Sequence, residues 1–152
     1  MKYLNKFKLL YEHQYGFHAG HSTIQPVIQF LDKVYNAMNN DKFTLSVFID
    51  LTKAFDTCDT DILLEKLKYY GFRGISNYWF RNYLTGRMQY TSVNNVNSSL
   101  NELKCGVPQG SVLGPILFLL LINDLPNATN MFSILFADDT TLQLSSSNIV
   151  SL

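Results

Sequence analysis

Residues 132–144 read FSILFADDTTLQL, and this stretch decides how the chain must fold. Apolar residues dominate Phe132–Ala137, and β-branched and apolar residues dominate Thr140–Leu144, so each half predicts a strand. Only Asp138 and Asp139 separate the two strands, which predicts a tight hairpin with two carboxylates at its tip. Adjacent carboxylates repel each other unless a cation lies between them, although an Asp pair in a turn is also ordinary turn chemistry.

A third carboxylate, Asp50, ends another predicted strand at Phe43–Leu51, which is rich in β-branched and aromatic residues. Alternation assigns one face to Leu45, Val47, Ile49 and Leu51 and the other to Thr44, Ser46, Phe48 and Asp50. Asp50 therefore ends the strand on its more polar face. If it meets Asp138 and Asp139, the three form a hard-oxygen site suited to Mg²⁺. Two such ions about 3.5–4 Å apart commonly support phosphoryl or nucleotidyl transfer.

The remaining segments alternate irregularly between helical and extended patterns. Helices are expected over about 22–39, from Asp59 or Asp61 to Gly71, over 75–84, and over 112–124 after a Gly/Pro loop at 106–110. Short strands are expected near 88–93 and 100–104, with Asn-rich turn residues between them. This order predicts an α+β fold, a sheet with helices packed on one face.

Composition bounds the class of protein. The chain has 152 residues, enough for one domain with a core, and 47% hydrophobic content excludes a disordered chain. A formal net charge of zero argues mildly against nucleic-acid binding, where a basic balance is usual. The apolar run Val112–Ile122 is shorter than the roughly 20 residues of a membrane span, so no membrane association is expected. Cys58 and Cys105 lack metal-type spacing and are expected to be reduced thiols in an intracellular protein.

Four segments, in order, resemble the motifs of reverse transcriptases of the non-LTR (LINE-like) retrotransposon branch. They are QYGFHAGHST at 14–23, FIDLTKAFDT at 48–57, GVPQGSVLGPILFLLLINDLP at 106–126 and FADDTTL at 136–142. One such segment would be weak, whereas four in register are specific, and they span about Gln14 to Leu144. The resemblance implies the fingers–palm portion of a right-hand polymerase, with fingers at about 14–42, palm at about 43–144 and the thumb absent.

The resemblance also implies roles for single residues. Asp50, Asp138 and Asp139 match the catalytic aspartates that ligate two Mg²⁺ ions, for which Mn²⁺ is a possible substitute. Phe55 matches the aromatic steric gate that crowds a ribose 2′-hydroxyl; without the motif it would be read as a core aromatic. The implied nucleotide-binding set is completed by the amides of Lys53 and Ala54 and by the loop residues Pro108, Gln109 and Gly110. Asp56 and Asp124 are expected to be structural.

The family resemblance implies an RNA-directed DNA polymerase that transfers nucleotides from dNTPs to a DNA primer on an RNA template. Nuclear localisation follows by family analogy. No thumb or endonuclease is expected within these residues, so the chain is interpreted as a section of a longer reading frame. The alternative is a truncated, catalytically inactive relic that at most binds RNA or protein. An unrelated phosphohydrolase would leave Phe55 and the loop at 108–110 unexplained.

The fingers motif departs from the family pattern at two positions. His18 stands where relatives usually carry arginine, and His21 stands where many relatives carry arginine, although histidine also occurs there in this branch. Arginine grips phosphate with two parallel hydrogen bonds that a neutral histidine cannot make. We therefore expect weak triphosphate binding through these positions. A zinc site built from His13, His18 and His21 is not favoured, because a fourth ligand and a nearby cysteine are missing.

Overall fold

A computed structural model describes residues 1–152, with the side chain of Ser151 left out. The chain divides into two compact units, one formed by Met1–Thr52 with Ile122–Leu152 and the other by Lys53–Leu121. The first unit contains α1 (Lys2–Lys6), α2 (Ile24–Met38), β1 (Phe43–Ile49), the 3₁₀ turns η1 (Leu125–Ala128) and η2 (Ile149–Ser151), β6 (Phe132–Phe136) and β7 (Asp139–Ser146). The second contains α3 (Thr60–Tyr69), α4 (Ile75–Leu84), β2 (Arg87–Gln89), β3 (Ser92–Val93), β4 (Val96–Asn97), β5 (Asn101–Leu103) and α5 (Gly114–Ile122).

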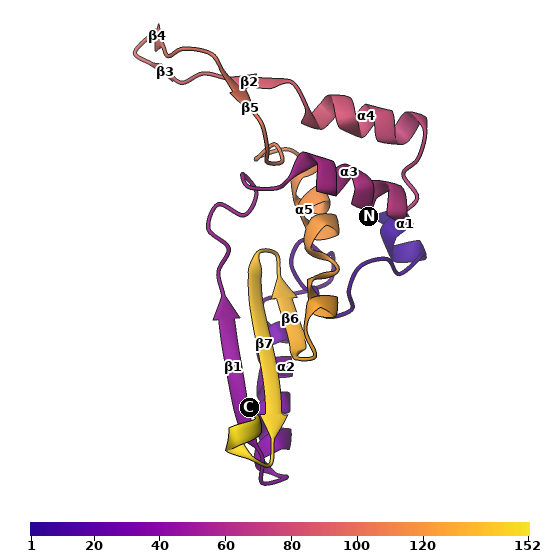
Figure 1. Cartoon of the computed structure of the whole chain (residues 1–152), viewed down its shortest axis with the longest axis vertical. Coiled ribbons are helices and arrows are strands. Elements are labelled where there is room, and N and C mark those ends of the chain that lie inside the picture. Colours follow the sequence, from indigo (N-terminus) through magenta and orange to yellow (C-terminus); the bar gives the residue numbers. More distant parts are fainter. The chain divides into compact units, whose positions relative to one another are not determined.

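The first unit is built on an antiparallel sheet with the strand order β1-β7-β6 (Figure 1). The β1–β7 ladder runs without a break from Phe43 opposite Ser146 to Ile49 opposite Thr140. The β6–β7 ladder ends where Phe136 pairs with Asp139. The strands predicted at 43–51, 132–137 and 140–144 are therefore present, with boundaries shifted by one or two residues.

Helix α2 covers one face of this sheet. The Phe30 ring lies 5.7 Å from the Phe48 ring, and the Lys33 Nζ lies 4.3 Å from the centre of the Phe132 ring. The Gln143 side chain donates to the Phe30 carbonyl at 3.5 Å. The strand register puts Phe48, Gln143 and Phe132 on the same face, so the predicted arrangement of a sheet with a helix on one face is confirmed.

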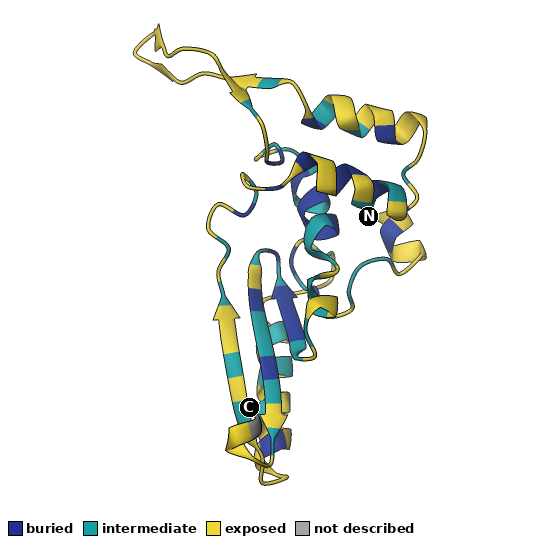
Figure 2. Ribbon diagram, viewed as in Figure 1, coloured by how far each residue is buried: buried dark blue, intermediate teal, exposed yellow. Residues whose placement is uncertain are grey.

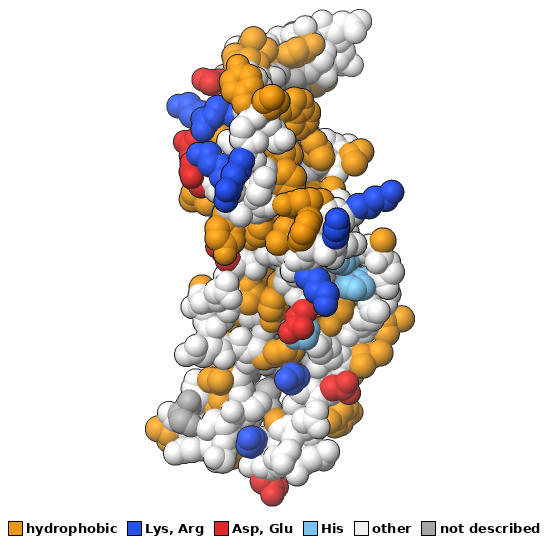
Figure 3. Space-filling view, turned by 90° about the vertical axis from the view of Figure 1, so that its right-hand side faces the viewer, with side chains coloured by type: hydrophobic (Ala, Val, Ile, Leu, Met, Phe, Trp, Pro, Cys, Tyr) orange, Lys and Arg blue, Asp and Glu red, His pale blue; other side chains and the backbone are white. Residues whose placement is uncertain are grey.

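Burial along β1 runs against the polarity of its side chains. Thr44 and Ser46, on the α2 side, are half-buried, whereas Leu45 and Val47 on the opposite face are 40% and 41% exposed (Figure 2). The periodicity located the two faces correctly but could not say which one the helix covers. Helix α2 shows the same inversion, because the apolar stripe that predicted it is largely exposed: Ile24, Val27, Ile28, Leu31, Tyr35 and Met38. Hydrophobic side chains also reach the surface on the face drawn in Figure 3.

The second unit packs its helices around an apolar core. Leu63, Leu64 and Leu67 of α3 are completely buried, and so are most apolar residues of α5. Helix α5 begins at Gly114, two residues later than predicted, because Ser111 Oγ accepts a hydrogen bond from the Gly114 amide. Val112 therefore lies before the helix, and it is 87% exposed. None of the helices in the described part of the chain has the length and apolarity that crossing a membrane requires.

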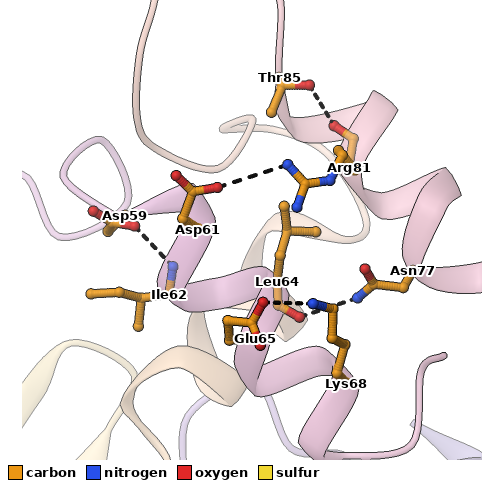
Figure 4. A network of polar contacts seen from close by, with 9 residues as sticks. All are labelled: Asp59, Asp61, Ile62, Leu64, Glu65, Lys68, Asn77, Arg81 and Thr85. Atoms are coloured by element: carbon orange, nitrogen blue, oxygen red, sulfur yellow. Dashed lines mark hydrogen bonds and ion pairs between the residues drawn. The ribbon is translucent and has the colours of Figure 1, made fainter.

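A polar network joins α3 to α4 (Figure 4). Asp59 caps α3, since its Oδ1 accepts from the Ile62 amide at 2.9 Å. Asn77 of α4, which is buried, donates to the Leu64 carbonyl at 3.1 Å. The Arg81–Asp61 pair is longer, at 3.9 Å, and both of its side chains are largely exposed, so it contributes little to stability. Of the two predicted starts, Asp59 and Asp61, the structure has the first, with Asp59 as the cap.

We expect Asp59→Ala to lower the free energy of unfolding by about 1 kcal/mol, because it leaves amide donors of the first turn of α3 without an acceptor. Asp59→Asn keeps an acceptor of the same length and should stay within a few tenths of a kcal/mol of the wild type. Urea unfolding followed by circular dichroism compares the three chains. Equal losses for both variants would show that the charge, and not the cap, carries the effect.

Candidate functional site

The β1–β7 ladder brings two of the predicted metal ligands to one end of the sheet. Ile49 pairs with Thr140, so the chain continues to Asp50 on one strand where the other begins with Asp139. Asp50 and Asp139 are exposed, and Asp138 is half-buried. These three aspartates, separated by up to 89 positions in the sequence, therefore lie at the same end of the sheet in the first unit.

The hairpin turn is shifted by one residue from the prediction. Asp139 is already paired in β7, so the two turn residues are Ala137 and Asp138 rather than Asp138 and Asp139. Ala137 has a φ of +56°, and Asp138 does not share this sign. A positive φ at the first turn residue alone is the pattern of a type II′ turn, which normally places glycine there. The turn is thus held in a backbone conformation that alanine does not favour.

The chemistry of this end of the sheet suits a hard cation. Its donors are carboxylate oxygens, and no Lys or Arg within the described residues forms an ion pair with Asp50, Asp138 or Asp139. Like charges without a counter-charge repel, and a divalent cation relieves that repulsion. Among the described side chains, however, no three His, Cys, Asp or Glu groups are gathered closely enough to hold a metal ion. The donor types fit magnesium, while the three carboxylates are not drawn together.

The second unit holds the predicted nucleotide-binding loop against residues 55–58. The Gly106 amide donates to the Cys58 carbonyl at 2.7 Å, and the Val107 amide donates to the Phe55 carbonyl at 2.8 Å. Gly106 has a φ of +88°, and a Cβ at this position would lie 2.8 Å from the Asp56 carbonyl oxygen. Only glycine therefore allows the two segments to approach this closely.

Asp56 fixes the orientation of Gln109. Gln109 Nε2 donates to Asp56 Oδ1 at 2.9 Å, and both side chains are exposed. The sequence predicted a structural Asp56, and this side chain holds the loop through its bond to Gln109. The contact spans 53 positions, so no local pattern could have revealed it.

Lys53, Pro108 and Gln109 line a cleft of about 670 Å³ in the second unit. Its lining also includes two cations that the sequence did not single out, Arg87 and Lys104. Arg87 donates to the carbonyls of Cys105 and Gly106, which anchors the start of the loop. The cleft is thus lined by three cationic side chains, Lys53, Arg87 and Lys104, and by two anionic ones, Asp56 and Glu102. Their sum is +1, in a chain whose net charge is zero.

The segment around Lys53 presents backbone amides. Lys53 has a φ of +53°, and neither its N–H nor that of Ala54 donates to a backbone acceptor in the described chain. Successive free amides in such a conformation can bind an anion. The Lys53 carbonyl, in contrast, accepts from the amides of Asp56 and Thr57, which closes the turn that follows.

Phe55 packs against α5. Its ring stacks on the buried Phe118 ring, with centroids 4.6 Å apart and an interplanar angle of 28°. Phe55 itself is only half-buried. One face of the ring thus packs on the core while part of the side chain remains accessible, and the role of Phe55 as a steric gate stays a prediction.

A sequence model of the family described as reverse transcriptase (RNA-dependent DNA polymerase) matches residues 1–151. The chain belongs to the reverse transcriptase family. It is 35% identical, over 91% of its length, to a probable RNA-directed DNA polymerase from transposon BS of Drosophila melanogaster. It is 30% identical, over 95% of its length, to the RNA-directed DNA polymerase from mobile element jockey of the same species. The predicted resemblance to reverse transcriptases of non-LTR retrotransposons is confirmed.

The chain spans only 16% of the length of each of these relatives. A solved structure of telomerase from Candida albicans, in complex with a TWJ fragment of telomeric RNA, has a similar fold with a TM-score of 0.68. The match covers 99% of this chain and 30% of that chain at 14% identity. The predicted class, an α+β portion of a polymerase fold, is confirmed, whereas the boundary between fingers (14–42) and palm (43–144) stays a prediction.

The motif at 14–23, which the family resemblance assigns to the fingers, carries a stacked histidine pair. The His18 and His21 rings lie 4.8 Å apart at an interplanar angle of 29°. Burial first, and the neighbouring His21 second, lower the pKa of His18 below its usual value of 6.5. The ring is therefore neutral at pH 7. The usual arginine would be positively charged there, so this position lacks a fixed charge for phosphate.

The histidine pair predicts a specific titration. We expect the His18 ring to titrate below pH 6.5 in a proton NMR titration, because burial disfavours its charged form. In His21→Gln the His18 midpoint should rise while staying below 6.5, since only the smaller of the two causes is removed. His13, whose pKa is lowered by burial and by Lys33, provides the control and should not move. An unchanged His18 midpoint in His21→Gln would contradict the coupling of the two rings.

Proposed function

We propose that this chain forms part of an RNA-directed DNA polymerase of a non-LTR retrotransposon. Membership of the reverse transcriptase family and the RNA-directed DNA polymerases among its relatives support the proposal. Its partners are then an RNA template, a DNA primer and dNTPs. The observation that supports a catalytic role is the β1–β7 register: it ends at Ile49 opposite Thr140, so Asp50 follows one strand at the end of the sheet where Asp139 begins the other.

In this proposal Asp50, Asp138 and Asp139 hold two Mg²⁺ ions, and Mn²⁺ can substitute for them. Bound cations of this kind favour deprotonation of an attacking hydroxyl and stabilise negative charge on the phosphoryl group and the leaving group. The aspartates supply hard oxygen ligands and fix where the cations bind. The primer 3′-hydroxyl gives its proton to solvent water, its oxygen forms a bond to the α-phosphorus of the dNTP, and pyrophosphate leaves with the electron pair of the broken P–O bond.

The second unit is proposed to recognise the nucleotide. The free amides of Lys53 and Ala54 suit an anionic phosphate oxygen. Gln109, with Pro108 and Gly110, offers a donor and an acceptor to a nucleotide or template, and the bond to Asp56 limits its rotamers. The cationic side chains of Arg87 and Lys104 in the same cleft add attraction for phosphate.

Phe55 is proposed as the steric gate. Stacking on Phe118 keeps its ring from moving aside. A fixed ring rejects a 2′-hydroxyl by exclusion, whereas a mobile one would yield to it.

An alternative is a protein that binds RNA or another protein without catalysis. Two observations favour it: the aspartates are not gathered into a three-ligand cluster within the described residues, and His18 is neutral at pH 7. Primer extension separates this alternative from a polymerase, because only a polymerase lengthens the primer.

We expect primer extension on an RNA template with Mg²⁺ and dNTPs, and its loss in Asp138→Ala/Asp139→Ala by at least about 100-fold, because the charge-stabilising cations lose their ligands. Asp41→Asn removes an exposed carboxylate of the same unit and should leave synthesis unchanged. Extension that survives in the double variant would exclude the aspartates from catalysis. No extension by the folded wild-type chain would favour the alternative without catalysis.

In a polymerase that contains this chain, Phe55→Val should reduce the preference for dNTPs over rNTPs by about 10- to 100-fold, the range that pocket shape provides. The ratio of kcat/KM for the two nucleotides measures this preference. Phe55→Tyr keeps the ring and its stacking on Phe118, so it should keep the preference. Unchanged selectivity in Phe55→Val would assign Phe55 to the core alone.

A further inference from the structure

The start of the fingers motif, Gln14–Gly16, and the preceding His13 lie alongside β6. Gln14 forms a parallel bridge with Leu135, the Tyr15 amide donates to the Leu135 carbonyl at 2.8 Å, and the Leu135 amide donates to the His13 carbonyl at 2.9 Å. The motif therefore pairs with β6 on the side away from β7, and β6 is the strand that leads into the aspartate hairpin.

Gln14 connects this segment directly to the hairpin turn. Its side chain is 2% exposed, and its Oε1 accepts from the Gly16 amide at 2.8 Å and from the Ala137 amide at 3.0 Å. The second bond joins residues 123 positions apart and ends one residue before Asp138. Its Nε2 is also buried and has no partner within the described chain, so the oxygen makes the side chain's hydrogen bonds.

Two further features show that this contact is closely fitted. A Cβ on Gly16 would lie 2.1 Å from the Ala137 nitrogen, so only glycine allows the segment to pass the turn. Ala137, whose φ of +56° is unfavourable for alanine, must be held by its surroundings. The buried amide oxygen of Gln14 supplies one such constraint, because breaking its bond would leave the Ala137 N–H buried and unpaired.

The residues on either side of Gln14 are fixed in turn by α2. Gln29 accepts from the Tyr15 hydroxyl and its Nε2 contacts His13 Nδ1 at 2.9 Å. Both neighbours of Gln14, His13 and Tyr15, are thus bonded to α2, and the Gln14 side chain itself is bonded to the turn. This gives Gln14 a fixed position from which to hold Ala137.

We propose that Gln14 is a positioning residue for the aspartate hairpin: its side-chain oxygen sets the backbone at Ala137 and thereby the direction in which Asp138 and Asp139 present their carboxylates to a divalent cation. The inference rests on the metal-binding role proposed above for these aspartates. It gives the fingers motif a task in the metal site, in addition to any contact with substrate. Groups that orient metal ligands in this way commonly change metal affinity when they are removed.

Gln143 provides a matched control. It is also a buried glutamine, 3% exposed, on β7 of the same sheet, and its bonds are to the Phe30 carbonyl and Ser46 hydroxyl, both at 3.5 Å. Neither bond involves the turn. Gln14→Leu and Gln143→Leu therefore remove the same polar group from similar surroundings, and only the first removes the contact with Ala137.

The first measurement is amide hydrogen exchange by NMR on the whole chain, with folding verified by thermal unfolding. We expect Gln14→Leu to lose the protection of the Ala137 amide while the Leu135 amide, bonded to His13, stays protected. Gln143→Leu should keep both. Gln14→Glu, which retains an acceptor oxygen at the same reach, should restore protection at Ala137. Protection at Ala137 that is unchanged in Gln14→Leu would overturn the proposal.

The second measurement is Mn²⁺ binding, followed by electron paramagnetic resonance, to the same chains and to Asp138→Ala. Gln14→Leu should weaken the Asp138-dependent affinity by about 10-fold or more, and Gln143→Leu should not. Equal affinity in Gln14→Leu and wild type, with Ala137 unprotected, would overturn the positioning role and leave the proposed metal site standing. If the wild type and Asp138→Ala bind Mn²⁺ with equal affinity while the Ala137 amide is protected, the metal site itself is refuted and the positioning role with it.

Discussion

The antiparallel ladder between β1 and β7 is the constraint on which the first unit depends. It joins segments about one hundred positions apart through an unbroken series of backbone pairs, from Phe43–Ser146 to Ile49–Thr140. Register in such a ladder is strict, because a shift by one residue would turn every side chain to the opposite face. The position of Asp50 relative to Asp139 is therefore set by strand pairing and not by the aspartates, which repel each other.

This repulsion explains why the hairpin needs support from outside itself. A turn that carries acidic residues, and has alanine at a position suited to glycine, gains little from its own sequence. The stabilising contacts come from β6, which is buried, and from the fingers motif through Gln14 and Gly16. The aspartate hairpin is thus held by residues outside it, a common arrangement where a turn carries local strain.

In the second unit, too, a loop is held by side chains that lie outside it. The loop at 106–110 is flanked by Asp56, which holds Gln109, and by Arg87, which holds the carbonyls of Cys105 and Gly106. Burial also raises the pKa of the Cys58 thiol to about 11, so this cysteine stays a neutral packing residue beside the loop. In the motif at 14–23, burial lowers the pKa of His18, so this ring is neutral at pH 7 where the family resemblance implies arginine.

The sequence alone determined the elements and the family. Helix α4 matches its predicted range, α2 and α3 start within two residues of theirs, and the aspartate hairpin is present with its turn shifted by one residue. These features are local, since periodicity, capping and turn residues act over a few positions. The tertiary structure decided what is not local: which face of β1 and α2 is covered, which residue occupies the strained turn position, and that Gln14 and Asp56 contact partners 123 and 53 positions away. The sequence does not show that Gln14 is buried and Asp56 exposed, and only the path of the chain in space shows that the first meets the Ala137 amide and the second the Gln109 side chain.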